Sequence, residues 1–178
     1  MDLMDLLKQA DSGNSVDQLA GAVGIPGSKA QDLIGALSPA LVRSLQKQAQ
    51  SRGGLEALQD ALTTGSHARY VEQPELLASA ATRDDGNKIL GHLFGSKDVS
   101  RNVAAQAAQQ TGIDASLIKK ALPLVAGLAM GALSKKSAAG SPVPSAEGLG
   151  GLLGGLMGGG DDDGLGVDDL LGLAKKLF

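Results

Sequence analysis

The sequence is dominated by residues that favour helices. Leucine and alanine, both strong apolar helix formers, account for 29 and 26 of its 178 residues. Valine, isoleucine and threonine together number 18, so strand-favouring side chains are scarce, and no segment sustains a strand-like alternation of apolar and polar residues. A chain of this length can bury one large hydrophobic core without disulfides or metal sites to stabilise it. The composition therefore predicts an all-α fold, a multihelical bundle.

Glycine and charge divide the chain near residue 140. Residues 1–139 hold 14 glycines with 14 basic and 13 acidic groups, a net charge of +1, whereas residues 140–178 hold 12 glycines with 2 basic and 6 acidic groups, a net charge of −4. We expect a multihelical domain over residues 1–139. A Gly/Pro/Asp-rich linker over residues 140–166 and a C-terminal amphipathic helix over residues 167–178 are expected to follow it.

Two corners of the predicted domain echo each other. The matching positions, in order, are Ala20, Gly24-Ile25, Leu33-Ile34 and Pro39 in the first, and Ala108, Gly112-Ile113, Leu117-Ile118 and Pro123 in the second. Proline is favoured at the first position of a helix, where its missing N–H loses no hydrogen bond, so Pro39 and Pro123 are each predicted to begin a helix. The echo predicts two related three-helix, helix-turn-helix-like units joined by residues 53–95.

Aspartates before apolar runs predict two further helix starts. Asp84 or Asp85 is expected to cap the segment over residues 86–95, and Asp98 is expected to cap a helix that buries Val99.

The run Asp-Gly-Asn-Lys-Ile-Leu-Gly-His-Leu-Phe-Gly at residues 85–95 resembles the YidB-like family of bacterial domains of unknown function, also called domain of unknown function 937. The second corner, the Leu122-Pro123-Leu124 step and the Gly/Leu tail ending in an amphipathic helix share the likeness, which spans nearly the whole chain. The resemblance implies a multihelical cytoplasmic bacterial protein, and it supplies neither a reaction nor catalytic residues.

No catalytic constellation stands out in the residues themselves. The absence of cysteine removes thiolate nucleophiles and Cys-based metal sites. His67 and His92 lack the spacing of a Ser-His-Asp or His-x-x-x-His arrangement, so we interpret both as ordinary core or surface histidines. We expect no enzyme, no cofactor and no metal site.

The acidic segment from Asp161 to Asp169 partly follows the spacing of a calcium-binding loop. Leu165 and Gly172 stand where that loop needs oxygen ligands. We interpret the segment as an acidic spacer or a helix-capping cluster, and weak calcium binding is left open.

Nucleic-acid binding is the less favoured interpretation of the two corners, because it requires cations that neutralise phosphates. The would-be recognition helix offers Lys29 close to Asp32, and the second corner offers Lys119 and Lys120. Gly127-x-x-x-Gly131 permits close helix approach, which favours packing within the bundle.

A transmembrane span is not expected either. The apolar run over residues 121–133 has 13 residues, whereas a span needs about 20. The acidic N-terminus lacks the basic region of a secretory signal, which favours a cytoplasmic location.

A 12-residue helix is marginally stable alone in water, so the C-terminal helix is expected to need a surface to lie on. We therefore expect a non-enzymatic interaction or scaffold protein that docks on a protein partner or a second copy through one apolar face. The residues predicted to dock are Val167, Leu170, Leu171, Leu177 and Phe178. The alternative is a nucleic-acid-associated regulator that uses the two corners, and peripheral membrane contact by the tail is left open.

Overall fold

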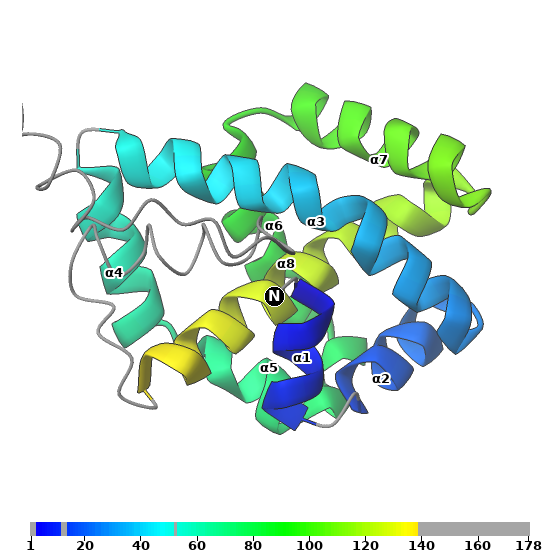
Figure 1. The fold of residues 1–178 in the computed structure, drawn as a ribbon, viewed down its shortest axis with the longest axis horizontal. Helices are drawn as coiled ribbons and strands as arrows, with labels where there is room; N and C mark the ends of the chain where they lie inside the picture. The colour runs from blue at the N-terminus through cyan, green and yellow to red at the C-terminus, as the bar shows by residue number, and fades with distance from the viewer. Residues whose placement is uncertain (1–2, 12–13, 52, 139–178) are drawn as a thin grey trace, which may run out of the picture.

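A computed structural model describes residues 3–11, 14–51 and 53–138 of the protein (Figure 1). Within these ranges the chain forms eight α-helices and two 3-10 helices. In chain order these are α1 (Leu3–Asp11), α2 (Asn14–Val23), α3 (Gly27–Gln50), α4 (Gly54–Thr64), η1 (Ser66–Ala68), α5 (Arg69–Glu72), η2 (Pro74–Ala78), α6 (Ala80–Phe94), α7 (Lys97–Thr111) and α8 (Ala115–Ala138). The prediction of an all-α, multihelical fold is confirmed. The predicted linker and C-terminal helix lie outside the described ranges.

Helix α8 forms the centre of the fold. It packs against every other α-helix of the described ranges, most extensively against α6. In Figure 1 it crosses the middle of the molecule, with α3 and α7 along one edge and α4 closing one end. Every residue from Ala121 to Ser134 is buried. A helix that is apolar on all sides is stable only when other elements surround it, and α8 has that surrounding here.

The internal echo corresponds to two matching corners. Helix α2 meets α3 at Gly24, where φ is +81°, and α7 meets α8 at Gly112, where φ is +68°. Both are left-handed conformations that glycine adopts without a Cβ clash, which explains the glycine at each corner. Each corner leads into a helix of 24 residues. Because α3 packs against α7 and α2 against α8, the two units pack on each other.

The prediction of three helices in each unit is wrong. Pro39 lies inside α3 and Pro123 lies inside α8, so each unit is a short helix followed by one long helix. Proline's fixed φ is compatible with a helix, and the local loss is the hydrogen bond to the carbonyl four residues earlier. Burial compensates in α3, because one apolar stripe continues on both sides of the proline. The stripe consists of Leu33, Leu37, Leu41 and Leu45.

The start predicted for α6 is also wrong. The helix begins at Ala80 and is capped by Ser79, whose Oγ accepts a hydrogen bond from the Thr82 backbone N–H at 3.2 Å. Serine caps as well as aspartate does, and Ser79 comes first along the chain. Asp84 and Asp85 therefore lie within the helix, where Asp85 is available for the contacts described below.

Helix α7 shows the same kind of displacement. Ser96 caps it, with its Oγ accepting a hydrogen bond from the Val99 N–H at 3.3 Å, so Asp98 lies in the first turn. Val99, predicted to be buried, is instead 42% exposed.

Candidate functional site

A buried polar cluster joins three elements: η1, α5 and α6. The Tyr70 hydroxyl donates a hydrogen bond to Asp85 Oδ2 at 2.6 Å, and His67 Nδ1 lies 3.3 Å from the same oxygen. Arg69 Nη2 donates to the Tyr70 hydroxyl oxygen at 2.9 Å. Tyr70 is 1% exposed and His67 is 9% exposed. One carboxylate thus lies beside two buried side chains from two neighbouring elements.

Glycines of α8 make room for this cluster. A Cβ on Gly131 would lie 2.6 Å from the His67 carbonyl oxygen, and one on Gly127 would lie 3.5 Å from the Tyr70 ring. Only glycine at position 131 therefore allows α8 to lie this close to the η1 backbone. The close approach predicted for Gly127-x-x-x-Gly131 is confirmed, and its partner is the short η1–α5 segment.

Two members of the cluster, Tyr70 and Arg69, have raised pKa values. Burial raises the pKa of the Tyr70 phenol above its ordinary value of 10.0, the hydrogen bond to Asp85 raises it further, and the hydrogen bond from Arg69 lowers it. The pKa of Arg69 is raised, chiefly by its hydrogen bond to Tyr70. Tyr70 therefore acts as a neutral donor to Asp85 at neutral pH. His67 Nδ1 lacks hydrogen-bond geometry toward that carboxylate despite its short distance, so the Tyr70–Asp85 hydrogen bond is the firm link in the cluster.

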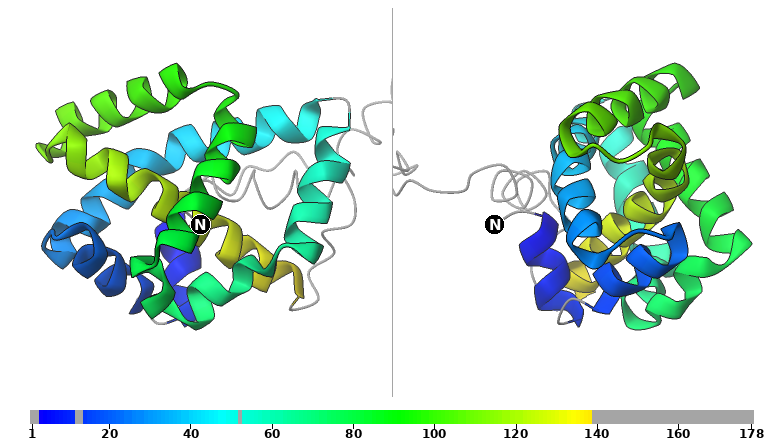
Figure 2. Two further views of the ribbon diagram at one scale, coloured as in Figure 1. Left: turned by 180° about the vertical axis from the view of Figure 1, so that it is seen from behind. Right: turned by 90° about the vertical axis from the view of Figure 1, so that its right-hand side faces the viewer.

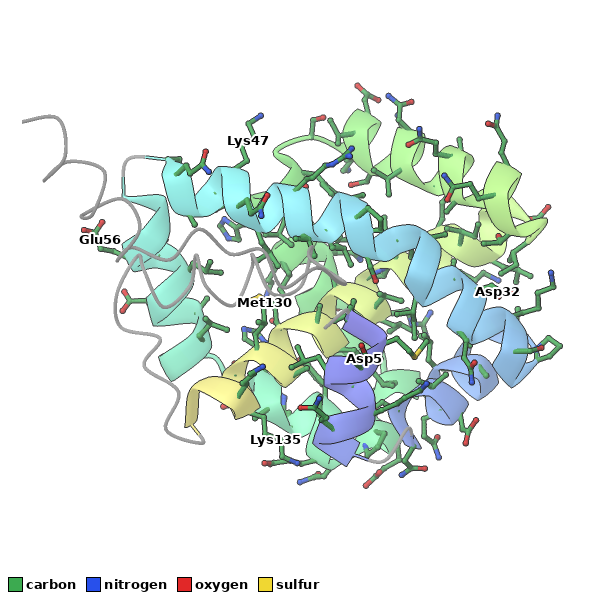
Figure 3. The ribbon with its side chains drawn as sticks, viewed as in Figure 1. Asp5, Asp32, Lys47, Glu56, Met130 and Lys135 are labelled. Carbon is green, nitrogen blue, oxygen red and sulfur yellow. The ribbon has the colours of Figure 1, made fainter. Side chains whose placement is uncertain are left out.

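An apolar hollow of about 140 Å³ opens between α4, α6 and α8. Its wall is aliphatic, and Gln48 of α3 and His92 of α6 complete the lining. The aliphatic lining residues are Ala57, Leu58, Ala61, Ile89, Leu93 and Met130. Met130, labelled in Figure 3, brings α8 into this lining. A dry cavity of about 150 Å³ holds a benzene ring, so this hollow has the size of one large apolar side chain.

A second, larger cavity of about 490 Å³ has a basic lining. It lies where α6, α7 and the first half of α8 meet, three helices that are seen together from behind in the left view of Figure 2. Lys97 and Arg101 of α7 and Lys119 of α8 contribute three cations to its wall. Leu122 and Pro123 give the same cavity an apolar side. This combination suits a ligand that is both anionic and partly apolar.

The cation of the first corner is used within the fold. Lys29 Nζ, near the start of α3, donates a hydrogen bond to the Thr111 carbonyl oxygen at 2.9 Å, at the end of α7. A cation at a helix C-terminus is electrostatically favourable. Lys29 therefore ties the two units together, while Lys119 of the second corner lines the basic cavity instead.

The five residues predicted to dock, Val167, Leu170, Leu171, Leu177 and Phe178, lie outside the described ranges, as does the segment from Asp161 to Asp169. His92 is exposed at the rim of the apolar hollow, whereas His67 is buried in the polar cluster. Among the residues that the structure describes, no group of three or more metal-ligating side chains comes together.

The contact of Asp85 with Tyr70 was missed because the carboxylate was interpreted as a helix cap. Tyr70 is the single tyrosine in a chain almost without aromatic residues, and this residue is the feature of the sequence that could have indicated the contact. The basic cavity was missed because Lys119 lies far along the chain from its partners on α7. The four-residue spacing of Lys97 and Arg101 places both on one helix face, and this spacing indicates the part of the site that α7 contributes.

Helix α8 is also long and apolar enough to span a membrane by length and composition alone. An 18-residue window of the segment Ala115–Lys136 has a mean hydropathy of 1.4. Within the fold 78% of this window is buried. That degree of burial is typical of the central helix of a bundle, which meets the same length and composition criteria.

These features define the chain as an all-α, multihelical protein whose two corner units share one central helix. The family profile described as "Bacterial protein of unknown function (DUF937)" matches residues 5–136. The chain belongs to this family, so the YidB-like resemblance seen in the sequence is confirmed, and the match spans the whole central fold. Comparisons with curated proteins and with solved structures found no match.

Proposed function

We propose that this chain is a cytoplasmic, non-enzymatic interaction protein that self-associates. In the proposed contact, the predicted C-terminal helix over residues 167–178 of one copy inserts Phe178 into the apolar hollow between α4, α6 and α8 of a second copy. The observation that carries the proposal is the hollow itself, which is open, aliphatic and about 140 Å³ in volume. An amphipathic helix laid in an apolar groove is a common form of peptide recognition.

The chemistry of the two surfaces matches. The ring of Phe178 has the size that the hollow accepts, and Lys175 and Lys176 directly precede the last two apolar residues. Helix α4, which forms one wall, contains Glu56 and Asp60 and no basic residue. The basic end of the docking helix would therefore lie beside a helix that carries acidic side chains, which favours one orientation over the reverse.

The predicted linker is long enough for the C-terminal helix to reach a hollow. Met130 of the hollow lies eight residues before the end of α8, which corresponds to about 12 Å along the helix. A flexible chain of the length of the predicted linker, residues 140–166, has a root-mean-square span of about 30 Å, which covers the hollow of the same copy or of a second copy. Each copy offers one helix and one hollow, so a reciprocal contact closes into a twofold dimer.

Analytical ultracentrifugation of the full chain over a range of concentrations tests this proposal. We expect a dimer for the wild-type chain and a weaker dimer for Phe178→Asp and for Ala57→Glu, the latter placing a charge on an exposed alanine of the hollow. Losing the burial of one aromatic ring corresponds to a roughly ten- to hundred-fold weaker association. Ala105→Glu on the exposed face of α7 is the matched control and is expected to leave the mass unchanged.

Mixing the two variants sharpens the experiment. Phe178→Asp retains an intact hollow and Ala57→Glu retains an intact helix, so the mixture is expected to form a heterodimer with one of the two contacts restored. A wild-type chain that stays monomeric at about 100 µM, or variants that dimerise as the wild type does, would contradict self-association.

A further inference from the structure

The basic cavity at the junction of α6, α7 and α8 has the features of a ligand site, and these features do not depend on self-association. Its volume of about 490 Å³ lies within the range typical of small-molecule sites. Three helices of one packed body form its walls, so the cavity is preformed. No acidic side chain is among the described residues that line it.

The positive charges converge from two helices. Lys97 and Arg101 lie one turn apart on α7, and Lys119 faces them from the first half of α8. Two acidic groups are near these cations. Asp98 Oδ1 lies 3.0 Å from Arg101 Nη1, and Asp114 interacts electrostatically with Lys119. The pair of Arg101 and Asp98 is exposed, with 65% and 82% of the side chains accessible, so water screens it strongly. Three cations against two acidic groups leave the junction net positive.

Polar groups suited to oxygen ligands surround these cations. The hydroxyls of Ser96 and Ser100 and the side-chain amide of Asn87 line the same cavity. Ser96 also caps α7, which places the positive end of that helix's dipole at the cavity wall. Cations, hydroxyls and a helix N-terminus together form the set of groups that binds phosphate in many proteins.

The apolar side of the cavity narrows the ligand class. Leu90 of α6 and Leu122 with Pro123 of α8 form an aliphatic wall beside the cations. A bare inorganic anion would leave this wall in water, whereas an apolar group attached to the anion would cover it. The ligand is thus expected to join a charged head to a small apolar body.

We propose that this cavity binds a phosphate monoester of a small apolar alcohol, with the phosphate held by Lys97, Arg101 and Lys119 and the apolar body against Leu122 and Pro123. A phosphate monoester carries a charge between −1.5 and −2 at pH 7, so the three cations attract it more strongly than they attract a singly charged anion. A carboxylate brings only half of this charge, so the phosphate is the better match. The proposal goes beyond the proposed self-association, and neither requires the other.

Phenyl phosphate is a suitable probe, added to the ¹⁵N-labelled full chain and followed by NMR. We expect saturable shifts of the backbone amides from Lys97 to Arg101 and around Lys119, and weaker binding of inorganic phosphate and of benzyl alcohol. Lys97→Gln and Lys119→Gln, both at exposed positions, are each expected to weaken binding roughly five-fold. Lys47→Gln is the matched control, since Lys47 lies on α3 and points away from the body of the protein (Figure 3).

Three results would overturn this proposal. The first is the absence of saturable shifts at these amides up to about 10 mM phenyl phosphate. The second is an equal loss of affinity in Lys47→Gln and Lys119→Gln, which would indicate non-specific attraction by net charge. The third is binding of benzyl alcohol as tight as that of phenyl phosphate, which would remove the role of the anion. Circular dichroism of each variant verifies that the fold is retained.

Discussion

Replacing Gly86 of α6 by alanine is expected to destabilise the fold, although alanine is the better helix former. Gly86 is buried where α6 crosses α8. An added Cβ would lie 2.6 Å from the Pro123 carbonyl carbon and 2.8 Å from the Pro123 Cβ, where ordinary contacts are 3.4–4 Å. These neighbours belong to the proline ring and backbone and cannot rotate away, so the two helices must separate locally by roughly 1 Å.

The size of the effect follows from two opposing contributions. Alanine in place of glycine in a helix interior stabilises by about 1 kcal/mol. Overpacking of a well-filled core destabilises by about 1–3 kcal/mol, and the contact between α6 and α8 is the most extensive in the described fold. We therefore expect the free energy of unfolding to fall by up to about 2 kcal/mol in Gly86→Ala.

Urea unfolding followed by circular dichroism at the helix band measures this change. Gly91→Ala, on the same helix, is the matched control, because Gly91 is exposed and its added Cβ would meet no described atom within 4 Å. The free energy of unfolding of Gly91→Ala is expected to rise by about 0.5–1 kcal/mol. The reasoning is refuted if Gly86→Ala is stabilised to the same extent as Gly91→Ala.

Two further predictions concern Tyr70 and Ser79. Tyr70→Phe is expected to cost about 1–2 kcal/mol at pH 8, because Asp85 loses its donor. The fold raises the pKa of Tyr70, so this phenol ionises at a lower pH in the unfolded chain than in the folded protein. The stabilisation by the Tyr70 hydrogen bond is therefore complete below pH 10 and is lost as the pH rises through the pKa of the folded state. Between pH 8 and pH 10.5 the free energy of unfolding is expected to fall more in the wild-type chain than in Tyr70→Phe. An equal fall in both chains would contradict this prediction. Ser79→Ala is expected to lower the free energy of unfolding by about 1 kcal/mol, because it removes the cap of α6. Asp84→Ala, at an exposed position, is expected to change it by less than about 0.5 kcal/mol. A larger loss in Asp84→Ala than in Ser79→Ala would identify Asp84 as the cap.

The fold class and both corners were predictable because they depend on local chemistry. Glycine at Gly24 and Gly112 marks the only residue type that tolerates those left-handed turns at low cost, and this property is visible in the sequence. Pro39 and Pro123 misled the prediction because proline occurs both at a helix start and, less often, inside a helix. The decision between the two depends on whether burial continues past the proline, which is a tertiary property.

The candidate sites were less predictable than the fold for the same reason. Asp85 can cap a helix or accept a hydrogen bond from a buried phenol, and local spacing favoured the first. Gly127 and Gly131 indicated a close approach without identifying the η1–α5 segment as the partner. Lys119 joins Lys97 and Arg101 only when α7 folds back along α8. In each case the contact depends on how helices cross, which no single segment encodes.

The position of α8 at the centre of the fold has a consequence for how the protein is made. The helix that touches every other described α-helix is also the last of them to leave the ribosome. Until residues 115–138 emerge, the earlier helices lack the central helix that each of them packs on, and the apolar faces that α8 covers stay open to water and to one another. Nascent chains that stop short of this segment should consequently depend on chaperones, and completion of the core becomes a single late event in synthesis.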